Sequence, residues 1–113
     1  MSAELVIKKL KKFKATVAVA ESITGGGLGQ ALTDIAGSSE VFLGGIISYS
    51  DESKIKELGI SKSSIKKFSA VSEEVAIEMA ESVRKKFKSN YGISTTGVAG
   101  PGKAYGQKAG TVW

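Results

Sequence analysis

The feature that most constrains the fold is the segment 20–27, Ala-Glu-Ser-Ile-Thr-Gly-Gly-Gly, in which an apolar run ends in hydroxyl side chains and three consecutive glycines. This pattern is typical of a strand that leads through a tight turn into a helix. Backbone N–H groups point outward at such a turn, and the positive end of the helix dipole favours an anion. The segment therefore predicts a site near Ser22 for a phosphate or a developing oxyanion.

Helices and strands alternate along the rest of the chain. The spacing of apolar residues predicts helices over 3–13, 51–58, 61–68 and 73–88, and another from Thr24 to about residue 36. Apolar runs predict strands over 16–20, 41–49 and 91–96, and residues 110–113 predict the start of a fourth strand. Such alternation is typical of an α/β protein whose largely parallel sheet is covered by helices on both faces.

The length of 113 residues and the hydrophobic content of 42% fit a single domain over residues 1–113. A strand that opens with Val112 and Trp113 normally continues across the core, so we expect the domain to be truncated at its C-terminus. No apolar run is long enough to span a membrane, and residues 1–14 lack the apolar centre of a signal peptide. We expect a cytoplasmic protein with no membrane partner.

The sequence contains no histidine and no cysteine. A Ser-His-Asp triad, a thiol nucleophile and nearly every zinc site are therefore excluded, and any hydrolysis must use serine, threonine, lysine, tyrosine or carboxylates. The net charge of +5 comes almost entirely from lysine, since Arg84 is the single arginine. Nucleic-acid recognition relies on the guanidinium group, so a nucleic-acid partner is a poor fit to this charge.

Polar residues gather where each of three predicted strands ends. The clusters are Glu21, Ser22 and Thr24; Ser48, Tyr49 and Ser50; and Thr95 and Thr96 with the glycine-rich loop 97–102. Because the carboxyl ends of parallel strands meet at one edge of a sheet, the clusters are expected to lie together and form a ligand site. Each cluster taken singly is better explained by ordinary turn chemistry, and only the three together favour a site.

Several short motifs together resemble the CinA C-terminal domain family. They are the segments 20–26, 37–39, 48–50 with Lys54, 70–73, 96–101 and 110–112, and the resemblance covers almost the whole chain. It implies a three-layer α/β/α sandwich, often a homodimer, that lacks its C-terminal strand and helix here. In active members it implies a nicotinamide-nucleotide amidase, which hydrolyses nicotinamide mononucleotide to nicotinic acid mononucleotide and ammonia without a metal or another cofactor.

The resemblance also implies roles for individual residues. Ser22 matches the proposed nucleophile, and Tyr49 and Lys54 match its partners in a Ser-Tyr-Lys arrangement. A lysine can act as the base if burial lowers its pKa, and a tyrosine can relay the proton. The hypothesis places the oxyanion on the N–H groups near Gly25 and Gly26. The remaining candidates for substrate binding are Glu21, Thr24, Ser38, Ser39, Ser50, Thr96, Gly97, Ala99, Gly100 and Pro101.

Within the segments that match, the chain departs from the family pattern at two places. Ser69 stands where the family usually has a glycine, and the loop 102–109 lacks further glycines and a Lys-Pro pair that are common in the family. The strand and helix that follow the Gly-Thr-Val segment in the family are also missing here. A non-catalytic module that binds a nucleotide or forms oligomers is therefore the alternative to an amidase. From the residues alone, Lys54 could also be a solvated helix lysine and Tyr49 a residue at the edge of the core.

Overall fold

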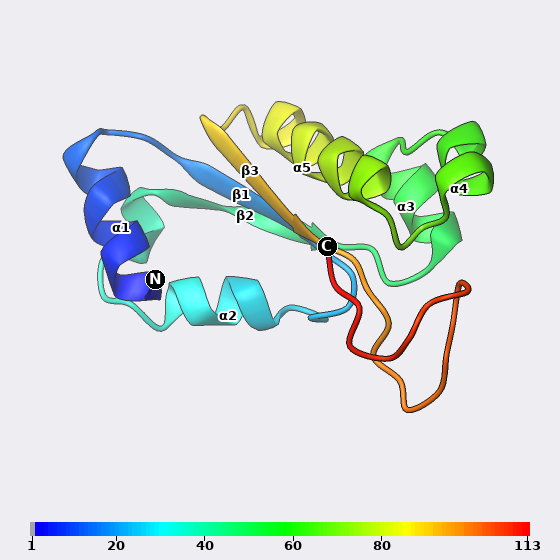
Figure 1. Ribbon diagram of the computed structural model, residues 1–113. Coiled ribbons are helices and arrows are strands. Elements are labelled where there is room, and N and C mark those ends of the chain that lie inside the picture. Colours follow the sequence, from blue (N-terminus) through cyan, green and yellow to red (C-terminus); the bar gives the residue numbers. More distant parts are fainter. Residues whose placement is uncertain (1) are drawn as a thin grey trace.

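The computed structural model describes residues 2–113 and shows an α/β fold built on a three-stranded sheet (Figure 1). The strands β1 (Val17–Glu21), β2 (Phe42–Ile47) and β3 (Tyr91–Thr95) are all parallel and lie in the order β2-β1-β3. The helices in chain order are α1 (Ala3–Lys12), α2 (Gly27–Thr33), the 3-10 helix η1 (Ser38–Glu40), α3 (Asp51–Leu58), α4 (Lys62–Phe68) and α5 (Glu73–Phe87). The predicted parallel sheet is confirmed.

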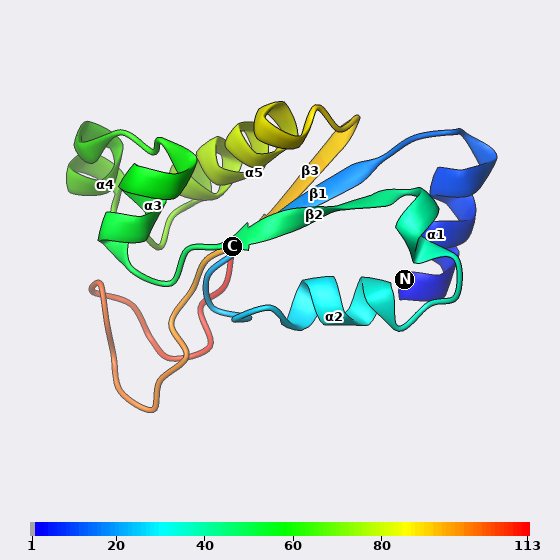
Figure 2. The same cartoon turned by 180° about the vertical axis from the view of Figure 1, so that it is seen from behind.

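The helices cover the sheet on both faces, which confirms the three-layer arrangement. Figures 1 and 2 show α3, α4 and α5 on one face and α1 and α2 on the other. All five residues of β1 are buried, and they alternate between the layers. Val17 and Val19 pack in the core on the side of α1 and α2, whereas Ala18 and Ala20 pack against α5. Successive residues of a strand point to opposite faces, so this single strand contributes to both cores.

Helix α5 packs closely on β3. A Cβ atom added at Gly92 of β3 would collide with the backbone oxygen of Ala80, so only glycine allows the helix to lie this near the strand. The buried residues Val75, Met79 and Val83 of α5 complete the core on this face. They belong to the four-residue spacing from which the helix was predicted.

The register of the sheet brings the three strand ends together. Glu21, the last residue of β1, is paired with Ile47 of β2 and with Thr95 of β3, which are the last residues of their strands. The segments that follow the strands therefore leave the sheet from one edge. The candidate site lies at this edge.

Two predicted elements differ from those in the structure. Helix α2 begins at Gly27 rather than Thr24, because Gly25 and Gly26 adopt left-handed backbone angles that a right-handed helix cannot include. Residues 110–113 do not form a fourth strand of the sheet. They run antiparallel to the segment after β3, where the N–H of Trp113 donates to the Thr96 oxygen at 2.9 Å. Within residues 2–113, no helix combines the length and the apolar character needed to cross a bilayer.

Candidate active site

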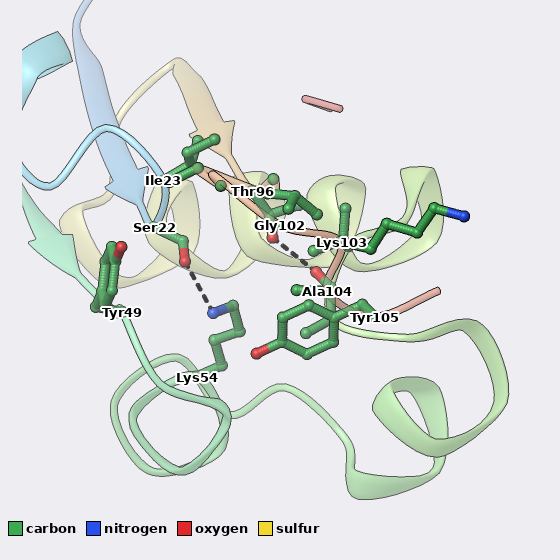
Figure 3. Close-up of a pocket in the computed structure, with 15 residues that line it drawn as sticks. Ser22, Ile23, Tyr49, Lys54, Thr96, Gly102, Lys103, Ala104 and Tyr105 are labelled. Carbon is green, nitrogen blue, oxygen red and sulfur yellow. Dashed lines mark hydrogen bonds between the residues drawn. The ribbon is translucent and has the colours of Figure 1, made fainter. Parts of the chain in front are cut away.

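A cavity of about 320 Å³ lies beyond the carboxyl ends of the strands (Figure 3). Its walls come from the ends of β1 and β2, from α3, from the turn before α5 and from the loop after β3. The lining residues are Ser22, Ile23, Tyr49, Lys54, Ala70, Val71, Thr96, Gly97, Val98, Ala99, Gly100, Gly102, Lys103, Ala104 and Tyr105. In open parallel sheets, ligands bind at this position.

Ser22 and Lys54 meet directly in this cavity. Lys54 Nζ lies 3.0 Å from Ser22 Oγ and donates to the backbone oxygen of Ser48 at 2.9 Å. The lysine is 2% exposed and the serine 6%. Burial lowers the pKa of the Lys54 amine, and the nearby negative charge of Asp51 opposes this effect only in part. A neutral amine held by the Ser48 oxygen can direct its lone pair at the Ser22 hydroxyl, which is the geometry of a general base.

The start of α3 positions Lys54. The Ser50 hydroxyl accepts from the N–H of Ser53, and the Ser53 hydroxyl accepts from the N–H of Ser50, so the two residues form a capping box. Lys54 follows immediately, one turn into the helix, and points back to the end of β1. Ser50 was predicted to bind substrate, but it does not line the cavity and its hydroxyl caps the helix.

Tyr49 lines the cavity but is not linked to the serine or the lysine. Its side chain is 63% exposed, and no hydrogen bond joins its hydroxyl to Ser22 or Lys54 within residues 2–113. Figure 3 shows the Tyr49 ring on the side of Ser22 away from Tyr105. Because Lys54 reaches Ser22 directly, this geometry needs no tyrosine to carry the proton between them.

The glycine turn after β1 is occupied by a carboxylate of the protein itself. Glu21 Oε1 accepts from the Thr24 hydroxyl at 2.5 Å and from the N–H groups of Gly26 at 3.1 Å and Leu28 at 2.8 Å. Glu21 Oε2 accepts from the N–H of Gly29 at 2.8 Å. Burial acts to raise the pKa of the Glu21 carboxyl, but these hydrogen bonds outweigh it and lower the pKa. The predicted anion site in this turn is therefore already filled.

This arrangement corrects the predicted oxyanion site. The N–H of Gly26 is bound to Glu21, and the N–H of Gly25 donates to the Ser22 oxygen at 3.0 Å. Neither group can hold a substrate oxygen without losing its present partner. Glu21, Thr24, Gly25 and Gly26 all lie outside the cavity lining, so none of them contacts a ligand placed there.

Ser38 and Ser39 were also predicted to bind substrate, and their place in the fold contradicts this. They form η1, which ends just before β2 begins at Phe42, whereas the cavity lies beyond Ile47 at the other end of that strand. Six residues of strand separate the two positions by about 20 Å. Figure 1 shows this turn beside α1, at the opposite end of the sheet. Helix α2 already ends at Thr33, and Gly37 with the two serines forms the start of η1 and does not build the site.

The loop after β3 does contribute to the cavity. Thr96, Gly97, Ala99 and Gly100 line it, and Pro101 does not. The buried Thr96 hydroxyl donates to the Ala70 oxygen at 2.7 Å and so fastens the loop to the turn before α5. In the part of the chain that the structure describes, the N–H groups of Gly97, Ala99 and Gly100 have no hydrogen-bond partner. They are donors that a phosphate or a ribose could use.

Several lining residues were missed by the sequence analysis. Ala70 and Val71 belong to a motif that supported the family resemblance, but no role in the site was assigned to them. Tyr105 lies in the loop that departs from the family pattern, so no motif pointed to it. The other missed residues are Ile23, Lys103 and Ala104, whereas Val98 and Gly102 belong to the loop 97–102 that was expected at the site. No group of three or more potential metal-binding side chains occurs within residues 2–113.

The sequence model described as CinA C-terminal domain matches residues 1–113. A relative named "Putative competence-damage inducible protein" from Thermoanaerobacter pseudethanolicus is 52% identical over 98 residues, which are 87% of this chain and 24% of the relative. A protein of the same name from Clostridium botulinum strain Loch Maree is 50% identical over 111 residues, which are 97% of this chain and 27% of the relative. The chain thus spans about a quarter of these curated relatives.

Solved structures show the same fold. The competence-damaged protein (CinA) superfamily protein from Escherichia coli is 34% identical and superposes with a TM-score of 0.95, covering 98% of this chain and 65% of that chain. The competence/damage inducible protein from Agrobacterium tumefaciens is 35% identical and superposes with a TM-score of 0.92, covering 97% of this chain and 67% of that chain.

Proposed function

The chain belongs to the CinA C-terminal domain family, and we propose that it hydrolyses the carboxamide group of nicotinamide mononucleotide to release nicotinic acid mononucleotide and ammonia. The observation that carries this proposal is the contact of 3.0 Å between Lys54 Nζ and Ser22 Oγ. Both groups are buried at a cavity, and the pair supplies a nucleophile and a base in a chain without histidine.

The first half of the reaction forms an ester. Neutral Lys54 takes the proton of the Ser22 hydroxyl while Oγ attacks the carboxamide carbon. The oxyanion needs a donor other than Gly25 and Gly26, and the N–H of Ile23 fits this role. It follows the nucleophile, it belongs to a residue that lines the cavity, and it has no partner within residues 2–113. The Lys54 ammonium then returns its proton to the leaving nitrogen, and ammonia departs.

The second half of the reaction uses the same groups. Lys54, neutral again, takes a proton from a water molecule that attacks the ester carbon, and the ammonium then returns a proton to Ser22 Oγ. The products are the carboxylic acid and the restored serine. The phosphate and ribose of the substrate are assigned to the N–H groups of Gly97, Ala99 and Gly100, which border the cavity. The cavity volume lies at the lower end of the range of small-molecule sites, roughly 300–1,000 Å³.

The test is ammonia release from nicotinamide mononucleotide by the 113-residue protein and by variants of the pair. Ser22→Ala is expected to lower the rate by a factor of about 1,000 or more, and Lys54→Met by about 100–10,000. Lys56→Met removes an exposed lysine of the same helix and is expected to leave the rate unchanged. If the unmodified protein releases ammonia and the Ser22→Ala variant releases it at the same rate, Ser22 is not the nucleophile.

The same preparation separates the alternative function. Calorimetric binding of the nucleotide without ammonia release would favour a module that binds nucleotides but does not hydrolyse them. Light scattering of the sample tests the proposed homodimer, because a mass near the 11.8 kDa of one chain would exclude it.

A further inference from the structure

Tyr105 occupies a backbone conformation that tyrosine rarely adopts. Ala104 and Gln107 exchange two backbone hydrogen bonds of 3.1 and 2.9 Å, which closes a two-residue turn around Tyr105 and Gly106. Both turn residues have left-handed backbone angles, with φ of 54° at Tyr105 and 71° at Gly106. Glycine, asparagine and aspartate are the usual residues in such a turn. Tyrosine at this place points to a role for its side chain, since strained residues gather at functional sites.

The turn is fixed so that its tip lies over the cavity. Gln107 Nε2 donates to the backbone oxygen of Val71 at 2.6 Å and ties the loop to the turn before α5. Figure 3 shows the Tyr105 ring next to Lys54, with its hydroxyl on the side of α3. Both side chains line the same cavity. The anchor and the tight turn therefore present a phenol to the helix that carries the base.

Asp51 is the acidic group on that side of the cavity. It is the first residue of α3, and its Oδ1 atom is buried with no hydrogen-bond partner within residues 2–113. A buried carboxylate oxygen without a donor is costly, so this atom favours any donor that can reach it. Asp51 lies three residues before Lys54 on α3, so the two side chains leave the helix on the same side, which is the side that the Tyr105 hydroxyl faces in Figure 3. Burial first, and then the charge of Asp51, raises the pKa of Tyr105, in keeping with this arrangement. Asp51 also acts on Lys54, since its charge favours the protonated amine.

We propose that Tyr105 is a positioning residue, whose hydroxyl closes on the Asp51 carboxylate and keeps that carboxylate from forming an ion pair with the Lys54 amine. The role rests on the proposed function, because it matters for turnover only if Lys54 is the base. An ion pair with Asp51 would hold Lys54 protonated and draw it away from Ser22. With the phenol as its partner, Asp51 is satisfied and Lys54 stays neutral beside the serine.

The other groups around the Lys54 amine do not carry this effect. Helix α3 contributes Asp51, the end of β2 contributes Tyr49, and the loop after β3 contributes Lys103 and Tyr105. The turn before α5 contributes only the apolar side chains of Ala70 and Val71. Glu21 is turned to a separate cavity beside α2, on the other face of the sheet. Asp51 is thus the carboxylate whose state Tyr105 can change.

Removal of the two partners must shift the titration of Lys54 in opposite directions. In Tyr105→Phe the Asp51 carboxylate has no phenol and turns toward the amine, so the pKa of Lys54 rises. In Asp51→Asn the negative charge is gone, so the pKa of Lys54 falls. The expected displacement is about one pH unit for the loss of the charge and somewhat less for the loss of the hydroxyl. A merely structural role for Tyr105 would not give shifts of opposite sign.

The experiment follows Lys54 by NMR of protein labelled at the lysine Cε carbons, with Lys54→Met used to assign its signal. Tyr105→Phe, Asp51→Asn and the double variant are titrated beside the unmodified protein. Glu52→Gln, which removes the exposed acid next to Asp51, is the matched control and should leave the titration unchanged. The double variant should show the same pKa of Lys54 as Asp51→Asn, because loss of the Tyr105 hydroxyl has no effect once the Asp51 charge is gone.

The acidic limb of the rate profile for ammonia release should move with the NMR titration. Two results would overturn the role of Tyr105. In the first, the pKa of Lys54 is the same in Tyr105→Phe as in the unmodified protein. In the second, both single variants shift the pKa of Lys54 in the same direction. The NMR measurement needs no turnover. Opposite shifts in a protein without amidase activity would therefore refute the proposed function and leave the interaction of Tyr105 with Asp51 standing.

Discussion

Glu21→Gln isolates the carboxylate that fills the glycine turn. The side chain is 1% exposed and both of its oxygens accept hydrogen bonds. Glutamine has nearly the same shape, and its oxygen can replace Oε1 and keep the bonds from Thr24, Gly26 and Leu28. Its NH₂ group must then face the N–H of Gly29, where two donors meet and no hydrogen bond can form.

The cost follows from this count of hydrogen bonds. A hydrogen bond to a charged group contributes about 1.5–3 kcal/mol, so the loss of the bond from Gly29 alone is worth that much. The three remaining bonds weaken as well, because neutral acceptors bind about half as strongly as ionised ones. We expect the free energy of unfolding to fall by about 2–4 kcal/mol, a large part of the roughly 5–15 kcal/mol that stabilises a domain.

Urea denaturation followed by circular dichroism measures this loss, with Glu57→Gln as the control for an exposed carboxylate on α3. The control should change the free energy of unfolding by less than about 0.5 kcal/mol. Because the folded state lowers the pKa of Glu21, its stabilising effect is complete above the usual carboxyl pKa of 4.5 and disappears as the pH falls through the lowered value. The difference between Glu21→Gln and the unmodified protein should therefore shrink in acid.

The same variant separates a structural role from substrate binding. Glu21 does not line the cavity, so the KM for the nucleotide should stay within about twofold at temperatures where the variant is folded. A variant of unchanged stability whose KM rises more than about tenfold would refute the assignment of Glu21 to the turn and restore it to the substrate site.

Two further predictions concern packing. Gly92→Ala should lower the free energy of unfolding by about 1–3 kcal/mol in urea denaturation, because its Cβ collides with the backbone of Ala80. Gly102→Ala adds a Cβ into open space and should change it by less than about 0.5 kcal/mol; equal effects of the two would contradict the close packing of α5 on β3. Ser48→Ala removes a buried hydroxyl that has no partner within residues 2–113 and keeps the backbone oxygen that holds Lys54. It should raise the free energy of unfolding by up to about 1 kcal/mol with ammonia release intact, and a loss of stability would show that the hydroxyl is bound after all.

Patterns that are local in the sequence predicted the layers of this protein well. The apolar runs at 16–20 and 91–96 are strands, and the four-residue spacing from Val75 to Val83 is the buried face of α5. The absence of histidine and cysteine restricted the possible nucleophiles and bases to a few residue types. The polar residues at the strand ends also pointed to the edge of the sheet where the cavity lies, because parallel strands must end together.

Contacts between distant segments decided the rest. The sequence makes Glu21 and the glycine turn look like a vacant anion site, and only the fold shows that the carboxylate of Glu21 takes its N–H groups. Ser38 and Ser39 look like further site residues, but a whole strand separates them from the cavity. Tyr105 reaches the site through a turn whose tie to Val71 joins residues 36 positions apart. Periodicity fixes which face of an element is buried, whereas the partner of a polar group depends on every donor and acceptor that folding brings within reach.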